Sequence, residues 1–424
     1  MRRVEVEPLW DVVEEHLDEA EFLWGVWRHS LVAPDYTLDE VAEGPEERLF
    51  AHLEGLVVGG PRVAERLLLP ALGSDEPSRV SAAALALLQG PRCDEALAAV
   101  VEVLRARPQQ RAPLVRALAC VDSAMTRSQL RELLADHDDT VVAAAAEVLA
   151  LHHEPLGDTL GLLLVSDDAA TRAMALRAAA NEPDPGRLVR AVIAGLQELE
   201  PSVLDAAIDA GVRMGLAPAW ARARERMHEV DGGAAMLLLA LGGEPGDIAA
   251  IEAALADRKR RLAALWALGF HGTPEVVDAA LEWLEDPVAG PLAGEVFSAV
   301  TGVDLAAAHM DLPREDDEAL EHRPEDDLPR ADPLAVLQWW TRHRERFVDG
   351  RRYVAGAAHS PAALLRGLRS GAMRRRPGHL LELTLALPPA RRPRVPLAAP
   401  TALQLRALAA MTLAEIAHVP EDMS

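Results

Sequence analysis

Apolar residues recur at three- and four-residue steps along most of the chain. The first such run extends from Trp10 to Leu31, with acidic residues between the apolar ones, and it predicts an amphipathic helix. A second helix is predicted over residues 46–58, where a Gly-Gly-Pro sequence ends it. We interpret residues 1–60 as an N-terminal helical cap. Its tryptophan stripe is interpreted as core, with a partner-binding face as the alternative.

Between residues 61 and 305 the pattern becomes repetitive. Leu-rich helices alternate with Ala-rich helices, and one or two aspartates precede many of the Ala-rich ones. The interval from Asp138 to Asp167 is 29 residues, and the interval from Asp257 to Asp286 is again 29. An aspartate in this place caps the following helix by accepting its unpaired backbone N–H groups. A helical-hairpin repeat of this length is typical of solenoids, and the spacing predicts about eight hairpins.

The predicted fold class is all-α, a HEAT-like α-solenoid in which helical hairpins form a right-handed superhelix. The composition agrees with it, since 50% of the residues are hydrophobic but only 4% are aromatic. Small and straight apolar side chains suit closely packed helices, whereas strands favour aromatic and β-branched ones. The last repeat helix is predicted to end at Thr301-Gly302, and the solenoid with it.

The chemistry of the chain changes after residue 305. Residues 306–332 are predicted to form an acidic loop or linker, because 311–332 holds ten acidic residues against three arginines and has little capacity to pack. Residues 333–424 are predicted to form an Arg-rich helical region, which begins at an Asp-Pro helix start. Further helices are predicted there over about 361–370, 377–387 and 401–417.

The net charge is −24, from 43 basic and 67 acidic residues. Nucleic acids and anionic membranes need counter-charge on the protein, so this acidic balance disfavours both as partners. No apolar run is long enough to span a membrane. The two cysteines show no CxxC spacing and are typical of a reducing compartment. We therefore expect a cytoplasmic protein, and the sequence indicates no oligomeric state.

No motif for catalysis is present. The sequence lacks a phosphate-binding loop, GxGxxG, GxSxG, HExxH and EF-hand spacing, so we predict no catalytic residue, no cofactor and no metal ligand. The adjacent His152, His153 and Glu154 point away from one another on a helix. The acidic run near residue 316 is interpreted as solvated rather than as a cation site.

Two groups of residues are candidates for binding a partner protein. The second helices of a HEAT solenoid form a concave face suited to an extended segment. Its expected polar residues are Arg79, Glu147, Arg172, Asp205 and Arg261. The second group is a C-terminal basic surface made of Arg366, Arg369, Arg374, Arg375, Arg376, Arg391, Arg392 and Arg394.

Three interpretations of the C-terminal arginines stay open. They pair with the acidic loop or the acidic solenoid of the same chain, or they bind an acidic partner protein. The third interpretation, nucleic acid, is the least favoured because few aromatic residues lie between the arginines for base stacking. In a related hypothesis the acidic loop binds the basic surface of its own chain until a partner displaces it. The basic run at residues 258–261 stands at the start of a predicted helix, where positive charge is electrostatically unfavourable. It therefore indicates that an acidic group from outside binds there.

Two stretches resemble a known family. The first is "EEHLDEAEFLWGVWRHSLVAPDYTLDEVAEGPEERLFAHLEGL", and the second is "GEVFSAVTGVDL" with the later "RRYVAGAAHSPAALLRGLRSGAMRRRPGHLLELTLALP". Together they are similar to an uncharacterised bacterial family of HEAT-repeat proteins, often encoded in type VI secretion gene clusters. The resemblance implies an accessory or effector-loading role, with a secretion spike protein, an effector or its chaperone as partner. It implies no catalytic residues.

We therefore predict a non-enzymatic protein-binding scaffold or adaptor. The alternative is an enzyme on a HEAT-like scaffold, either nucleic-acid-binding and of DNA-glycosylase type or resembling phycobilin lyases. A glycosylase needs a basic groove with aromatic residues and a placed carboxylate. Trp266 and Trp283 with Asp257 are the available candidates, and we interpret them as core and helix cap.

Overall fold

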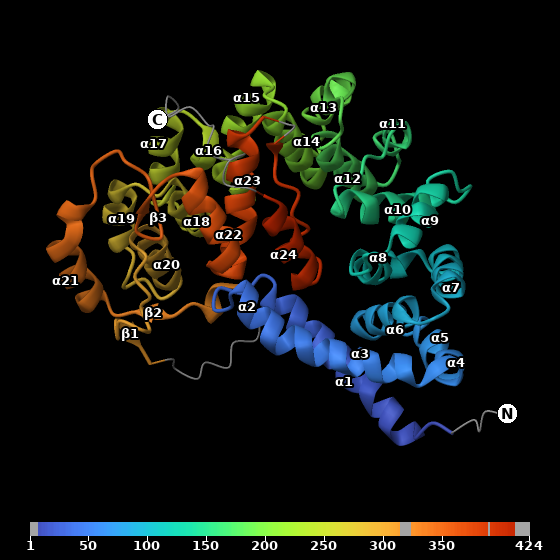
Figure 1. The fold of residues 1–424 in the computed structure, drawn as a ribbon. Coiled ribbons are helices and arrows are strands. Elements are labelled where there is room, and N and C mark those ends of the chain that lie inside the picture. The colour runs from blue at the N-terminus through green and yellow to red at the C-terminus, as the bar shows by residue number, and fades with distance from the viewer. Residues whose placement is uncertain (1–6, 314–323, 389–390, 412–424) are drawn as a thin grey trace. The chain divides into compact units, whose positions relative to one another are not determined.

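The computed structural model describes residues 7–313, 324–388 and 391–411. These residues are almost entirely helical, and their strands are limited to two short antiparallel pairs. Along residues 61–305 the helices fall into eight pairs in chain order. The predicted fold class, an all-α solenoid of helical hairpins, is confirmed (Figure 1).

The chain forms two compact units. Unit 1 consists of Met1–Val32, Tyr36–Asp167 and Arg394–Ala410, and unit 2 consists of Ala33–Asp35, Asp168–Pro393 and Met411–Ser424. This grouping does not follow the four predicted segments, because part of the predicted C-terminal region belongs to the same unit as the N-terminal helices.

Unit 1 is built on a ladder of helices in which α1 packs on α6, α6 on α8, and α8 on α10. The helix α3 packs on both α1 and α6, so the predicted N-terminal cap lies directly against the first repeats. The helices are α1 (Trp10–Ser30), α2 (Leu38–Val41), α3 (Glu47–Val58), α4 (Gly60–Val63), α5 (Leu69–Ala71), α6 (Pro77–Gln89), α7 (Cys93–Ala106), α8 (Arg111–Ala119), α9 (Ala124–Leu133), α10 (Asp139–Leu151), α11 (Thr159–Leu163) and α24 (Thr401–Ala410).

Two π-helical turns join short helices of unit 1 into longer ones. The turn Ala42–Glu46 connects α2 to α3, and the turn Ala64–Leu68 connects α4 to α5. The first turn contains Pro45, whose missing N–H prevents a regular helical hydrogen bond. The widened π turn accommodates that interruption. The helix predicted over 46–58 is therefore the second half of a longer one.

Glu46 is a buried carboxylate that ties α24 to the rest of unit 1. The Trp27 indole N–H donates to it at 2.8 Å. The Thr401 backbone N–H donates at 2.9 Å to one carboxylate oxygen, and the Thr401 hydroxyl donates at 2.6 Å to the other. The carboxylate therefore caps the start of α24, a helix that is distant in sequence. It also accepts the hydrogen bond of the buried Trp27 indole N–H.

We expect Glu46→Ala to lower the free energy of unfolding of unit 1 by about 2–3 kcal/mol, because the buried hydrogen-bond donors of Trp27 and Thr401 then lack an acceptor. Urea titration of the full chain measures this. Limited proteolysis should also cut near α24 sooner in the variant. The neighbouring exposed Glu47→Ala is the matched control. Equal unfolding midpoints for the two variants would contradict the role assigned to Glu46.

Unit 2 contains a regular ladder in which α12, α14, α16, α18 and α20 pack in succession, with α13, α15, α17 and α19 against them. Its helices are α12 (Ala169–Ala179), α13 (Val189–Gly195), α14 (Pro201–Arg213), α15 (Ala217–Arg226), α16 (Gly233–Gly242), α17 (Pro245–Ala254), α18 (Arg261–His271), α19 (Pro274–Leu281), α20 (Gly290–Thr301), α21 (Pro333–His343), α22 (Pro361–Ser370) and α23 (Arg376–Ala386). The strands are β1 (Asp311–Leu312), β2 (Arg330–Ala331), β3 (Tyr353–Val354) and β4 (Ala357–Ala358).

Aspartate caps start several helices, as predicted from the repeat pattern. Asp138 accepts from the Thr140 N–H at 2.8 Å at the start of α10. Asp286 accepts two backbone N–H groups, at 2.9 Å each, just before α20. Two positions need correction. Asp257 lies in the turn before α18, where it accepts the Lys259 N–H at 3.0 Å, and the N-cap position of α18 is Arg260, which provides no side-chain cap. At α12, Asp168 and not Asp167 is the cap. Of two adjacent aspartates, only the one with extended backbone angles directly before the helix places its carboxylate on the open N–H groups.

The helix α20 ends at Gly302, as predicted. Gly302 has a φ of 76°, the left-handed conformation that a glycine adopts at a helix end without steric cost. The β3–β4 hairpin then binds the last turn of α20, since the Ala355 N–H donates to the Ala299 carbonyl at 2.7 Å and the Gly356 N–H to the Val300 carbonyl at 2.9 Å. Orphan carbonyls of the helix end are thus satisfied by the C-terminal region.

The structure describes the two ends of the predicted acidic loop. Its central residues, 314–323, lie outside the described residues. At its two ends, β1 pairs with β2, and a 3₁₀ turn over Pro324–Asp327 packs on α20. Leu328 and Ala331 are both buried at 5% exposure. The expectation of a wholly solvated segment is therefore wrong for residues 324–332, because those two apolar side chains anchor it.

The helices of the C-terminal region match the prediction closely. The helix α22 has the predicted bounds, and α23 begins one residue before its predicted start. The helix α21 begins after Asp332, which caps it, with Pro333 in its first turn as predicted. The predicted extension of α24 to residue 417 lies mostly outside the described residues. Because α23 packs on α14 and α16, the C-terminal region covers part of the helix ladder of unit 2.

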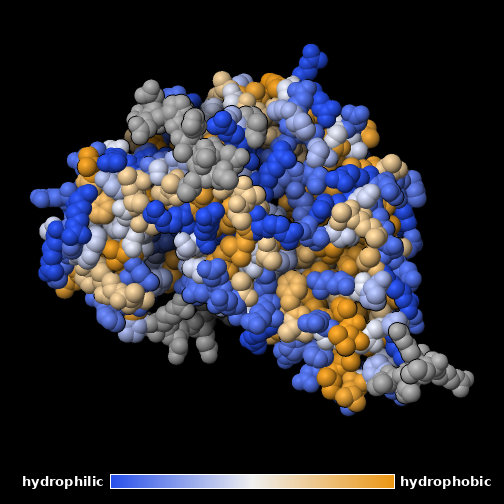
Figure 2. Space-filling view, in the orientation of Figure 1, coloured by the Kyte–Doolittle hydropathy of each residue, from blue (hydrophilic) through white to orange (hydrophobic). Residues whose placement is uncertain are grey.

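The face drawn in Figure 2 carries hydrophilic residues over much of its area, with apolar residues in separate groups. Figure 2 shows one such group over α1 and α3. Exposed apolar side chains of these two helices include Val12, Phe22 and Val58. None of the helices described here has both the length and the apolar character required to cross a lipid bilayer.

Candidate partner-binding site

The arginines at 374 and 375 do not form a surface. The side chain of Arg374 is 8% exposed and that of Arg375 is 10% exposed, and both lie 3.6 Å from the carboxylate of Glu295 on α20. Arg375 also donates to the Gly269 carbonyl at 2.7 Å. Arg374 is 3.2 Å from Glu325 of the acidic segment. The predicted basic surface is therefore wrong for these residues, and the interpretation as pairs within the chain is the one that fits.

This cluster holds α23 against the helix ladder. Burial raises the pKa of Glu295, while the charges of Arg375 and Arg374 oppose that rise. The Arg375 guanidinium also lies 4.1 Å from the centroid of the Phe270 ring. Arg376 is 1% exposed and donates to the Leu368 carbonyl at 2.7 Å, and burial lowers its pKa to about 10. Three consecutive arginines are thus interior parts of unit 2.

The other predicted arginines differ in their exposure. Arg392 is half-buried and donates to the Arg213 carbonyl at 2.6 Å. The exposed members of the group are Arg366, Arg369, Arg391 and Arg394. Arg394 lies in unit 1, and the other three lie in unit 2. Partner binding by these exposed arginines stays a prediction.

The five residues predicted for the concave face are all engaged inside the chain. Their side chains are between 14% and 33% exposed, and each forms an ion pair with a residue of another helix or turn. The pairs are Arg79 with Asp18 and Glu21, Glu147 with Arg111, Arg172 with Glu198, Asp205 with Arg226, and Arg261 with Asp286. These residues connect neighbouring helices in the structure, and partner binding by them stays a prediction.

The candidates for a glycosylase-like site are also used internally. The Arg374 guanidinium lies 4.4 Å from the Trp266 ring centroid, and Arg261 lies 3.7 Å from that of Trp283. Asp257 pairs with Arg260 at 2.8 Å. The basic run at the start of α18 therefore meets acidic groups of its own chain, and the two tryptophans carry arginine on their faces rather than an open stacking surface.

A second buried polar cluster was not predicted. Glu382 on α23 is 4% exposed, pairs with Arg352, and lies 2.7 Å from the His359 Nε2. Burial alone would raise the pKa of Glu382, yet the bond to His359 and the charge of Arg352 hold that pKa below its usual range. Burial lowers the pKa of the nearby His379 to about 3. No sequence spacing links these residues, since the fold alone brings them together.

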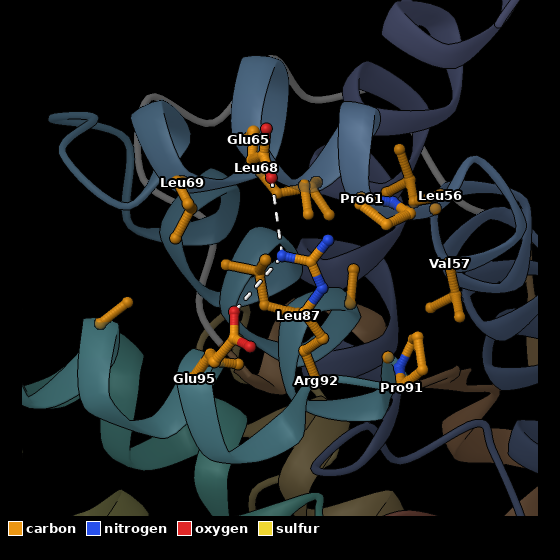
Figure 3. Close-up of a pocket in the computed structure, with 16 residues that line it drawn as sticks. Leu56, Val57, Pro61, Glu65, Leu68, Leu69, Leu87, Pro91, Arg92 and Glu95 are labelled. Carbon is orange, nitrogen blue, oxygen red and sulfur yellow. Dashed lines mark hydrogen bonds and ion pairs between the residues drawn. The ribbon is translucent and has the colours of Figure 1, made fainter. Parts of the chain in front are cut away.

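Unit 1 contains a pocket whose lining is mainly apolar. Its volume is about 260 Å³, and α3, the helix through α4 and α5, α6 and α7 surround it (Figure 3). Its lining consists of Leu56, Val57, Gly60, Pro61, Ala64, Glu65, Leu68, Leu69, Ala86, Leu87, Gly90, Pro91, Arg92, Glu95, Ala96 and Ala99.

Small side chains and a π turn create this pocket. Ala86, Ala96 and Ala99 line it where larger apolar residues of α6 and α7 would fill the space. On the opposite wall, Ala64 and Leu68 belong to the π turn, whose extra residue rotates the following side chains relative to a regular helix. The sequence signal for such a pocket is weak, because alanines in helices are also the mark of close packing.

Three charged side chains cross the pocket. Figure 3 shows Arg92 reaching between Glu65 and Glu95, at 3.5 Å and 3.3 Å respectively. Their side chains are 46%, 65% and 72% exposed. Ion pairs this exposed contribute about 1 kcal/mol or less each, so a ligand can separate them at small cost. The pocket therefore offers an apolar surface to a ligand. The charged side chains at its rim can move apart, and they include two carboxylates and one guanidinium.

The chain matches no protein-family model and no curated protein. Among solved structures, an engineered protein is 17% identical, with a TM-score of 0.30, and the match covers 88% of this chain and 98% of that chain. Human deoxyhypusine hydroxylase in complex with glycerol is 19% identical, with a TM-score of 0.23, and the match covers 65% of this chain and 94% of that chain. Neither likeness bears on what this chain binds or catalyses.

Proposed function

We propose that this protein is a non-enzymatic scaffold that binds another protein, and that the apolar pocket of unit 1 receives aliphatic side chains of that client. The observation that carries the proposal is the pocket itself, which is lined mainly by apolar residues and has an exposed ionic rim. Burying one leucine-sized side chain in it contributes about 1.5–3 kcal/mol to binding. Hot spots of protein interfaces are pockets of this kind.

The charges at the rim favour one kind of client segment. Glu65 and Glu95 outnumber Arg92, and the whole chain carries a charge of −24. A client segment with an aliphatic residue beside lysine or arginine fills the pocket and pairs with the carboxylates. Electrostatic attraction over the acidic surface also raises the association rate of such a client.

The resemblance to a HEAT-repeat family of secretion gene clusters supports a more specific proposal. In it the client is a type VI secretion spike protein, an effector or an effector chaperone, and the protein acts in the cytoplasm as an accessory or effector-loading factor. This part rests on the family resemblance alone.

Filling the pocket tests the proposal. We expect Ala64→Phe, which places a ring into the pocket, to weaken client binding at least tenfold, whereas Ala51→Phe on the exposed face of α3 leaves it unchanged. The tagged full chain is purified from its native host at moderate salt, its companions are identified, and their affinities are measured. A client that binds both variants equally would contradict a role for the pocket. If no other protein is purified together with the tagged chain, this result would contradict the adaptor function.

A further inference from the structure

Two histidines face each other across α1 and α3 in unit 1. The Nδ1 atoms of His16 and His52 are 3.1 Å apart, and the ring centroids are 5.0 Å apart. Both side chains are half-buried. One imidazole therefore donates its Nδ1 proton to the other in the metal-free protein.

The position of the His16 ring depends on Gly55, which follows His52 by three residues on α3. A Cβ atom at Gly55 would lie 2.8 Å from the His16 Nε2 and 2.9 Å from its Cε1. No side chain other than hydrogen therefore fits beneath this ring without displacing it. His52 and Gly55 lie on the same face of α3, where the glycine leaves room for the His16 imidazole and His52 contacts its Nδ1.

The separation of the two nitrogens suits a metal ion. A transition metal binds imidazole nitrogen at about 2.0–2.1 Å, so two nitrogens on one ion lie roughly 2.9–3.4 Å apart for bond angles between a right angle and the tetrahedral value. The observed 3.1 Å lies inside that range. Rotation of the rings about χ2, a soft torsion for histidine, turns both lone pairs toward a shared ion.

We propose that His16 and His52 form a chelating site for a divalent transition-metal ion such as Zn²⁺, Ni²⁺ or Cu²⁺. Both imidazoles bind as neutral ligands through Nδ1, and the proton between them moves to an Nε2. Within the described part of the chain, no group of three or more His, Cys, Asp or Glu residues is placed to hold a metal. Water molecules therefore fill the remaining coordination positions of the ion. Imidazole ligands favour these ions, with Cu²⁺ bound most tightly.

The bound ion would link α1 to α3, which are otherwise joined by side-chain packing. The helix α3 also supplies Leu56 and Val57 to the apolar pocket. A ligand that binds the folded state and not the unfolded state raises the stability of the fold. The ion is thus expected to stiffen one wall of the pocket, although the site itself does not depend on the proposed client.

The test is a titration of the untagged full chain with NiCl₂ and with ZnCl₂ by calorimetry. We expect one equivalent to bind, with an affinity at least tenfold higher than in His16→Gln or His52→Gln, and a metal-dependent rise in unfolding temperature in the wild type alone. His137→Gln, whose side chain is 86% exposed, is the matched control and should bind like the wild type. The metal-free unfolding temperature identifies any variant that has lost its fold.

Gly55→Ala provides a second test that removes neither ligand. Because the added Cβ displaces the His16 ring, this variant should lose most of the metal affinity while both histidines are present. Wild-type affinity in both glutamine variants, or no binding by the wild type, would overturn the proposal. Loss of binding in the glutamine variants with full binding in Gly55→Ala would overturn the role of the glycine.

Discussion

Replacing Arg375 with alanine is expected to lower the free energy of unfolding of unit 2 by about 3–5 kcal/mol, because it leaves the buried carboxylate of Glu295 with one arginine fewer. The same change removes the hydrogen bond from Arg375 to the Gly269 carbonyl. Urea titration of the full chain measures the loss. Hydrogen exchange of peptides from α18 and α20 locates it, since these helices carry the partners of Arg375.

Two variants make this result specific. Arg366→Ala changes an exposed side chain of α22 and should alter stability by about 0.5 kcal/mol or less. The double variant Glu295→Met, Arg375→Met replaces these two charges with apolar side chains and should recover part of the loss, because Arg374 keeps Glu325 as a partner at 3.2 Å. If Arg375→Ala unfolds at the same urea concentration as Arg366→Ala, the buried cluster does not hold the C-terminal helices as we describe.

Acidification from pH 7 to pH 4 is expected to destabilise unit 2 through its buried histidines. Burial lowers the pKa of His379 to about 3 and that of His271 to about 4. In the unfolded chain a histidine has a pKa of about 6.5. Between pH 6.5 and pH 4 the unfolded state therefore binds more protons than the folded state, so the free energy of unfolding falls as the pH falls.

The expected loss is on the order of 3 kcal/mol for His379 and less for the half-buried His271. Glu382 acts in the same direction, because its lowered pKa gives stability that is also lost in acid. His379→Asn should lower stability by a constant amount and flatten the pH dependence, as measured by urea midpoints at pH 7, 6, 5 and 4. His137→Asn is the control. Identical slopes in the wild type and in His379→Asn would exclude His379 as the cause.

Features with a local signal were predictable from the sequence. Asp332 caps α21 because a short carboxylate side chain stands directly before a proline-led helix, and Gly302 ends α20 because glycine alone adopts its backbone angles readily. The bounds of α22 follow from a serine cap and a glycine stop. In each case the cause lies within a few residues of the effect.

The arginines of the C-terminal region show where such reasoning fails. A run of basic residues usually lies on the surface, and nothing near Arg375 in the sequence indicates a carboxylate 80 positions earlier on α20. The pocket was missed for a related reason. Whether Ala64 and Ala99 allow close packing or leave a hollow depends on which helices surround them, and the sequence pattern is the same in both cases.

The contact of Glu46 with Thr401 has a consequence for biosynthesis. Unit 1 contains residues from both the early and the late part of the chain, and roughly 240 residues separate α11 from α24. At ribosomal rates these take roughly 10–50 s to synthesise. During that interval the Glu46 carboxylate has not yet met Thr401, so unit 1 completes its fold only after nearly the whole of unit 2 has left the ribosome. The order of folding along this chain is therefore not the order of its translation.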